Sequence, residues 1–159
     1  MNISLRSEVY PQDVENVRNI VESTGFFYPH EVKIAVELVE ERLSKGPASG
    51  YEFLFAEVDG TTVGYSCFGL NPSTKKSFDL YWIATFKDLR GKGIGKFLLE
   101  ETCRKVKEMG GTAIYAETSG RPLYKPTRMF YENNGFICEA VLRDFYDDGD
   151  DKLIFVRRL

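Results

Sequence analysis

Apolar residues recur along the chain at two different spacings, one typical of helices and the other of strands. Positions three and four apart repeat over four segments, which indicates one buried face of an α-helix in each. Asp13 stands where the first of these helices would have its N-cap, and Gly46-Pro47 and Gly135 end two others. The pattern predicts helices over residues 13–23, 30–45, 93–109 and 127–134.

Short apolar and aromatic runs between these segments have the length and residue types of strands. Asp59-Gly60 between two such runs is a strong signal for a β-hairpin. An acidic turn over residues 147–151 joins the last two runs as an antiparallel pair. The pattern predicts strands over residues 3–9, 53–57, 62–69, 78–85, 112–117, 136–145 and 152–157. Strands and helices in this order predict an α/β (α+β) fold with a mixed sheet and helices packed on it.

Composition restricts the class of protein further. The 159 residues have no internal repeat or linker, so we expect a single domain spanning residues 1–159. A formal net charge of −3 gives no electrostatic reason to expect a nucleic-acid partner. The three cysteines are scattered and His30 is the only histidine, so we expect reduced thiols and no metal site. No apolar stretch is long enough to span a membrane and no secretion signal is evident, so we expect no membrane association and a cytoplasmic protein.

The strongest motif lies between a predicted strand and a predicted helix. It reads Arg90-Gly91-Lys92-Gly93-Ile94-Gly95-Lys96. Glycines allow sharp turns and close approach of a ligand to the backbone, and the first amides of a helix lack acceptors within the helix. These amides, the helix dipole and three basic side chains together predict a phosphate or pyrophosphate site. The alternative is a tight connection with solvated charges.

Two common phosphate loops do not fit this spacing. A Walker A loop needs four residues between its glycines and then Lys-Ser/Thr, whereas here three residues separate Gly91 from Gly95 and Phe97 follows Lys96. The dinucleotide-binding motif GxGxxG needs a glycine where Lys96 stands.

The loop resembles the Arg/Gln-x-x-Gly-x-Gly/Ala signature of the GNAT superfamily of acyl-CoA-dependent N-acyltransferases, which Arg90, Gly93 and Gly95 match. Tyr131 through Gly135-Phe136 is similar to the family's Tyr-x-x-x-Gly-Phe segment. The order of the predicted elements matches the family along nearly the whole chain. The resemblance implies a single mixed, mostly antiparallel sheet of six to seven strands flanked by about four helices.

The resemblance also implies acetyl-CoA as cosubstrate and no metal. The pyrophosphate would bind Arg90 and the backbone of residues 91–96, and pantetheine would pair with the fourth strand near Ile83, Ala84 and Thr85, which a bulge opens in this family. Many members have an asparagine seven residues before the tyrosine, where this chain has Tyr124 in a longer loop. Either Ser119 or Tyr124 replaces that contact, or the loop belongs to the acceptor site. The sequence leaves both open.

Catalytic roles follow from the same resemblance. Tyr131 matches the tyrosine that protonates the departing thiolate in this family. The transfer needs little driving force, because a phenol pKa of about 10 is close to that of a thiol. The alternative for Tyr131 is packing on its helix. Glu117 is the first candidate for the general base and Asp79 the second, and a chain of water molecules would make both unnecessary.

The resemblance places the acceptor site at the loop after the first helix and at the last hairpin. The residues there are Phe26, Phe27, Tyr28, Asp144 and Tyr146, and Tyr81 of the predicted strand 78–85 is a further candidate. Acidic residues in the hairpin would attract an ammonium group, and Arg121 or Arg143 would suit a carboxylate, although a solvated turn also explains the acidic charge. We therefore expect transfer of an acetyl group to the primary amine of a small molecule such as an amino acid. The alternatives are a peptide or protein acceptor, or a non-catalytic acyl-CoA-binding domain. The family also permits a homodimer through an edge strand, which no residue requires.

Overall fold

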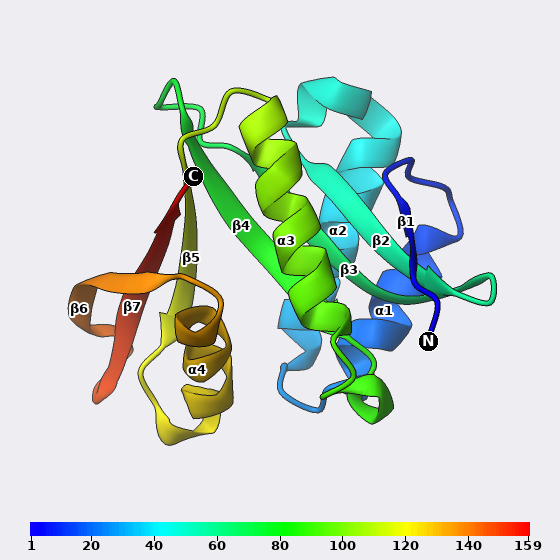
Figure 1. The fold of residues 1–159 in the computed structure, drawn as a ribbon. Helices are drawn as coiled ribbons and strands as arrows, with labels where there is room; N and C mark the ends of the chain where they lie inside the picture. Colours follow the sequence, from blue (N-terminus) through cyan, green and yellow to red (C-terminus); the bar gives the residue numbers. More distant parts are fainter. The chain divides into compact units, whose positions relative to one another are not determined.

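The computed structural model describes the whole chain, from Met1 to Leu159, and contains seven β-strands and four α-helices (Figure 1). The strands are β1 (Ser4–Arg6), β2 (Glu52–Val58), β3 (Thr61–Leu70), β4 (Ser77–Thr85), β5 (Ala113–Ser119), β6 (Ile137–Asp147) and β7 (Asp150–Arg158). The helices are α1 (Asp13–Ser23), α2 (Pro29–Lys45), α3 (Ile94–Glu108) and α4 (Lys125–Asn133). The strands hydrogen-bond in the order β1-β2-β3-β4-β5-β7-β6 as one mixed sheet, which confirms the predicted fold.

The chain divides into two compact units that interleave in the sequence. The first contains Met1–Gly69 and Trp82–Arg104, and the second contains Leu70–Tyr81 and Lys105–Leu159. The chain passes from one unit to the other at the last residue of β3, inside β4 and inside α3.

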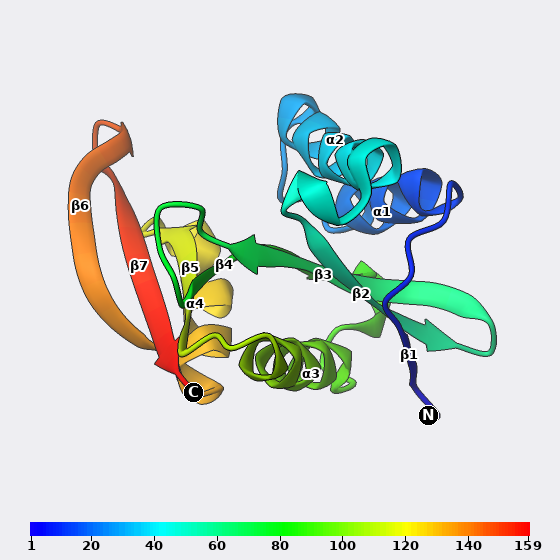
Figure 2. The same ribbon diagram turned by 90° about the horizontal axis from the view of Figure 1, so that it is seen from above.

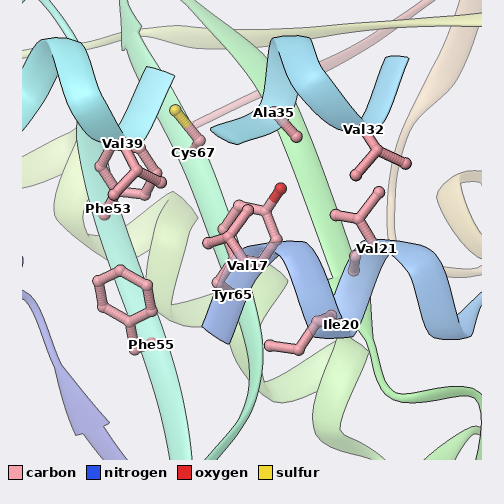
Figure 3. Packing of buried hydrophobic residues seen from close by; sticks show 11 residues of the cluster. Val17, Ile20, Val21, Val32, Ala35, Val39, Phe53, Phe55, Tyr65 and Cys67 are labelled. Carbon is pink, nitrogen blue, oxygen red and sulfur yellow. The ribbon is translucent and has the colours of Figure 1, made fainter. Parts of the chain in front are cut away.

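In the first unit, helices cover both faces of the β1–β3 strands. Helices α1 and α2 lie on one face and α3 lies on the other (Figure 2). Side chains from α1, α2, β2 and β3 meet in a buried cluster (Figure 3). On the α3 side, the buried hydroxyls of Ser66 and Thr102 hydrogen-bond at 2.7 Å.

The predicted hairpin between β2 and β3 is confirmed. Asp59 and Gly60 both have positive φ, 51° and 76°, as the tight two-residue turn of a hairpin requires. Helix α2 begins with Pro29, and the carboxylate of Glu31 accepts a hydrogen bond from the Tyr28 amide at 3.1 Å. Helix α2 ends at Gly46. None of the helices combines the length and apolar character needed to cross a bilayer.

In the second unit, β4 and β5 form the parallel pair. Residues Ser77–Leu80 pair with Ala113–Ala116, and β5, β7 and β6 then continue as antiparallel strands. Helix α4 contacts this sheet through Tyr131, whose ring lies 5.8 Å from that of Phe155 in β7.

Two details differ from the sequence-based expectations at the N-terminus. Strand β1 covers only three residues. Asp13 is the first residue of α1, after the N-cap Gln12, so its prediction as N-cap was wrong. The buried carboxylate of Asp13 instead accepts two hydrogen bonds from the Arg6 guanidinium, at 2.8 and 2.9 Å, and one from the Tyr10 amide at 2.8 Å. The Asp13 carboxylate therefore forms a tertiary ion pair with Arg6 instead of capping the helix as predicted.

Candidate functional site

The predicted phosphate loop lies in the first unit, at the N-terminus of α3. Gly91 and Gly93 have φ of 76° and 85°, which residues with a side chain rarely adopt, and the space where a Cβ would stand is open at both. The Phe97 amide makes the first helical bond, to the Gly93 carbonyl at 3.0 Å, so the amides of residues 94–96 precede any acceptor within the helix. This loop therefore presents backbone amides and an approachable backbone, which fits the pyrophosphate of coenzyme A.

Arg90, the basic residue that opens the loop, lies against an aromatic side chain. Its guanidinium carbon is 5.0 Å from the centre of the Phe26 ring. The structure thus brings together a residue predicted to bind the coenzyme and one predicted to bind the acceptor.

The other two aromatics of the α1–α2 loop have different surroundings. Phe27 packs edge-on against Trp82 of β4 at 4.9 Å and joins the margin of the buried cluster. Tyr28 is 61% exposed and stacks on His30 at 5.7 Å. Of the three aromatics, Phe27 therefore supports the fold, and Tyr28 remains accessible to a ligand.

The strand segment predicted to hold pantetheine closes β4. Ala84 is buried, while Ile83 and Thr85 are partly exposed. Buried and less buried residues alternate from Ser77 to Leu80 but not from Tyr81 to Ile83, as a bulge in the strand would cause. This interruption fits the bulge that the resemblance implies.

Tyr131 lies on α4 in the second unit and is 6% exposed. Its ring packs against Phe130, Phe136 and Phe155, with centroid distances of 5.7, 5.2 and 5.8 Å. Burial in this aromatic setting raises the pKa of the phenol well above its ordinary value. Tyr131 therefore keeps its proton at neutral pH, as a general acid must, and it also packs on its helix as the alternative interpretation expects.

Glu117 and Asp79, the two candidate bases, lie on the same face of the second unit's sheet. Glu117 is 53% exposed, and its carboxylate is 2.7 Å from the Lys152 ammonium group. Asp79 is half-buried, and its carboxylate accepts a hydrogen bond from the side-chain amide of Asn71 at 3.0 Å. Burial raises the Asp79 pKa and Glu117 raises it further, against the lowering effects of Asn71 and Lys152.

The acid and base candidates of the second unit lie on opposite faces of its sheet. Tyr131 stacks on Phe155, whereas Glu117 is the cross-strand partner of Ile154, the preceding residue of β7. Because successive side chains of a strand point to opposite faces, the phenol and the carboxylate belong to different sides.

The end of β5 and the loop after it contain the two predicted replacements for the family's asparagine, Ser119 and Tyr124. The Ser119 hydroxyl donates a hydrogen bond to the Asp150 carboxylate and accepts one from the Arg121 amide at 3.1 Å. Arg121 also pairs with Asp150 at 3.2 Å, and its guanidinium lies 5.6 Å from the Tyr124 ring. The Ser119 hydroxyl is therefore engaged with β7 and the loop, and the Tyr124 ring lies against the Arg121 guanidinium.

The last hairpin carries the other predicted acceptor residues. Asp144 has a positive φ of 55°, and its carboxylate accepts a hydrogen bond from the Gly149 amide at 2.9 Å. Phe145 and Tyr146 are exposed and pack edge to face at 5.1 Å. Tyr81 of β4 is likewise exposed, two residues from Asp79. The Asp144 carboxylate thus shapes the hairpin, whereas the three aromatics present accessible rings.

Sequence reasoning missed Lys152 and Arg128. Arg128 donates hydrogen bonds to the carbonyl oxygens of Ser119 and Arg121, at 3.0 and 2.8 Å, and so fixes the loop before α4. Neither residue belongs to a motif. The only usable signal was strand register, which determines that Lys152 lies beside the strand carrying Glu117.

The mixed sheet, the open loop at the start of α3 and the buried tyrosine on α4 are features of an acyltransferase. The sequence profile of the Acetyltransferase (GNAT) family matches residues 15–136, and the chain belongs to this family. An N-alpha-acetyltransferase from Sulfurisphaera tokodaii is 32% identical over an alignment of 117 residues, and the match covers 67% of this chain and 69% of that protein.

Solved structures show the same fold. A protein from Desulfovibrio desulfuricans that was assigned to the GNAT-family acetyltransferases superposes with a TM-score of 0.97 at 48% identity, over 99% of both chains. The PaiA N-acetyltransferase from Thermoplasma acidophilum, in complex with coenzyme A, superposes over 100% of both chains with a TM-score of 0.75 at 21% identity. The chain is thus an acetyltransferase of this family, and its relatives include proteins that bind coenzyme A.

Proposed function

We propose that the protein transfers the acetyl group of acetyl-CoA to a primary amine. The observation that carries the proposal is the loop from Arg90 to Lys96, with two glycines in left-handed conformations and helix-start amides that have no acceptor within the helix. Acetyl-CoA supplies the thioester whose carbonyl carbon the amine attacks. The residues of the chain have to hold the coenzyme, take a proton from the amine and give one to the leaving sulfur.

Each of these tasks has a candidate in the chain. The amides of residues 91–96 with Arg90, Lys92 and Lys96 bind the pyrophosphate, and the backbone of Ile83 and Thr85 pairs with the pantetheine amides. Tyr124 contacts the pantetheine arm. Lysine and arginine side chains add charge-assisted hydrogen bonds to the phosphates.

Proton transfer involves one residue on each face of the second unit's sheet. As the C–N bond forms and the C–S bond breaks, Glu117 accepts the ammonium proton, directly or through water, and Tyr131 donates its phenolic proton to the departing sulfur. Burial raises the pKa of the Tyr131 phenol, and the same desolvation raises the pKa of a thiol beside it. The two acidities can therefore stay close enough for transfer.

The acceptor is a primary amine of a small molecule, such as the α-amine of an amino acid. In the first unit the exposed Tyr28 offers a ring against which such a molecule can pack, and in the second unit Tyr81 and Tyr146 offer such rings. The N-terminal α-amine of a polypeptide is the second candidate. The 32% identity to an N-alpha-acetyltransferase favours it. Both candidates share the α-amino group.

Calorimetry of acetyl-CoA binding to Gly93→Glu tests the coenzyme assignment. The added carboxylate opposes the pyrophosphate charge, so we expect affinity at least about 100-fold below wild type, equivalent to about 2.7 kcal/mol. Gly60→Glu is the matched control, because Gly60 has φ of 76° and equally open space but lies in the β2–β3 turn. Equal affinities for the two variants would show that the loop does not bind the coenzyme.

Assays of thiol release then identify the acceptor. The panel contains free amino acids, polyamines, aminoglycosides and peptides with free or blocked N-termini. Turnover on small amines alone supports the first candidate, and turnover on free but not blocked peptides supports the second. Tight coenzyme binding without turnover on any amine would favour a non-catalytic acyl-CoA-binding domain.

A further inference from the structure

Lys152 is a lysine with little exposure and two specific partners. Only 13% of its side chain is exposed. Its ammonium group is 2.7 Å from the Glu117 carboxylate and 4.1 Å from the centre of the Phe145 ring. Lysine is rarely buried to this extent unless its charge is paired, and here one partner is an anion and the other an aromatic face.

Strand register explains why one residue reaches both partners. Lys152 lies on β7, the middle strand of the β5-β7-β6 order, opposite Ser119 of β5 and Leu142 of β6. Glu117 is two residues before Ser119 and so lies on the same face of β5 as the diagonal neighbour of Lys152. Phe145 follows Leu142 by three residues on the other side. Lys152 thus bridges the candidate base and the hairpin predicted to contact the acceptor.

Phe145 lies in a β-bulge of β6. The pairing of β6 with β7 is interrupted between Leu142 and Asp147, which pair with Lys152 and Asp150, so four residues of β6 oppose one residue of β7. The Asp144 amide donates a hydrogen bond to the Asp151 carboxylate at 3.0 Å. With the hydrogen bond from the Gly149 amide to the Asp144 carboxylate, this holds Asp144, the neighbour of Phe145, at two points. The backbone on either side of Phe145 therefore has defined contacts, and the Phe145 ring lies over the Lys152 ammonium group.

We propose that Lys152 is a positioning residue that holds the Glu117 carboxylate in place through their ion pair and holds the Phe145 ring beside it. The inference rests on the proposed function, because it assigns Glu117 to proton acceptance and the hairpin to the acceptor. Lys152 itself touches no reacting atom. Lys152 couples acceptor binding to proton removal, because its ammonium group positions both the Glu117 carboxylate and the Phe145 ring.

Other charged groups near this face belong to three strands. Asp79 of β4 interacts electrostatically with both Glu117 and Lys152, and Tyr115 of β5 is the cross-strand neighbour of Asp79. Asp150 of β7 is neutralised by Arg121 and hydrogen-bonded by Ser119. Asp79 is therefore a reporter for the cluster, because it responds to Glu117 and Lys152 with opposite signs.

The first test needs no acceptor. Carbon-13 NMR of the Asp79 carboxyl gives its titration midpoint in the intact protein. Removing the cation in Lys152→Met should raise the midpoint, and removing the anion in Glu117→Gln should lower it, by a few tenths of a pH unit or more in each case. Lys152→Arg should leave it close to wild type, as should Lys107→Met, which removes an exposed charge elsewhere in the second unit. An unchanged midpoint in Lys152→Met would overturn the inference, whether or not an acceptor is known.

The second test uses turnover with the acceptor identified above. In Lys152→Met we expect KM for the acceptor to rise several-fold and kcat to fall, with acetyl-CoA affinity unchanged. Lys152→Arg should restore both kinetic parameters. A purely structural lysine would change stability while leaving KM and kcat for the acceptor unchanged, and that result would overturn the inference. Absence of turnover in the wild type would instead count against the proposed function, while the Asp79 titration would still decide the electrostatic coupling.

Discussion

Two tyrosines of this protein are almost completely buried, and their surroundings differ. Tyr65 lies in the cluster between the sheet and helices α1 and α2, where its hydroxyl has no hydrogen-bond partner (Figure 3). Tyr131 lies among aromatic rings on α4. The phenol that we propose as the general acid and a structural one therefore have similar burial, and burial alone does not distinguish them.

The substitution Tyr131→Phe separates the packing role from the proton donation that we propose. The ring and its contacts are kept while the proton is lost, so we expect kcat to fall by roughly 10²-fold. Acetyl-CoA affinity should stay within about two-fold of wild type. Steady-state kinetics and calorimetry measure the two effects, and an unchanged kcat would remove Tyr131 from the acid role.

Tyr65→Phe is the matched control and also a prediction about stability. Because an unpartnered buried hydroxyl costs about 1–3 kcal/mol, its removal should leave the free energy of unfolding unchanged or raise it by up to about 1 kcal/mol. Turnover should equal that of wild type. Urea unfolding measures the stability, and a loss of more than about 1 kcal/mol would mean that the hydroxyl has a partner in solution.

At the residue scale, what could be predicted depended on whether a residue belongs to a motif. Arg90, Gly93 and Tyr131 stand in local patterns whose spacing matches a known family, so they could be proposed from the sequence alone. Lys152 could not, because its role depends on two strands that are distant in sequence. Asp13 was misassigned for the same reason, since its partner Arg6 lies on another element.

At the scale of elements, apolar patterns and turn signals predicted all four helices and all seven strands, including β6, which is almost entirely exposed and was indicated by the acidic turn before β7. The ends of helices and strands differed from the prediction where tertiary contacts determine them. The β1–α1 junction is an example. There, Arg6 of β1 pairs with the fully buried Asp13 of α1, and Asn16 and Thr62 complete the hydrogen-bond network.

This junction makes stability depend on pH. Burial raises the pKa of Asp13, but hydrogen bonds from Arg6, Tyr10 and Asn16 outweigh it and lower the pKa below its ordinary 3.8. A depressed folded-state pKa contributes stability above the unfolded pKa and loses it as pH falls through the folded value. The contribution of this pair is therefore present at pH 7 and decreases below about pH 4.

Asp13→Asn tests this dependence. At pH 7 it should cost about 3–5 kcal/mol, because the Arg6 charge is left with one fewer partner in a partly buried setting. At pH 3 the difference from wild type should be smaller. Urea unfolding at both pH values measures it, and Glu15→Gln, in the same helical turn but exposed, should change stability by less than about 0.5 kcal/mol. A difference that does not change with pH would show that the Asp13 charge is not responsible.

At the scale of the whole molecule, the two compact units raise the question of whether they unfold separately. The chain passes between them at the last residue of β3, inside β4 and inside α3, so separating them would break at least one strand and one helix. We therefore expect one cooperative transition, as the single domain predicted from the sequence requires.

Gly111→Ala puts this expectation to a direct test. An alanine Cβ at this position would lie 2.4 Å from Val106 and 2.7 Å from Phe78, all within the second unit, so overpacking should cost about 1–3 kcal/mol. Trp82, the only tryptophan, lies in the first unit and reports on it by fluorescence. If the chain unfolds as one body, the fluorescence midpoint in urea should fall together with the midpoint from circular dichroism. A fluorescence midpoint that stays at the wild-type value while the dichroism midpoint falls would show that the first unit unfolds independently, since a strain confined to one unit can reach the other only through shared cooperativity.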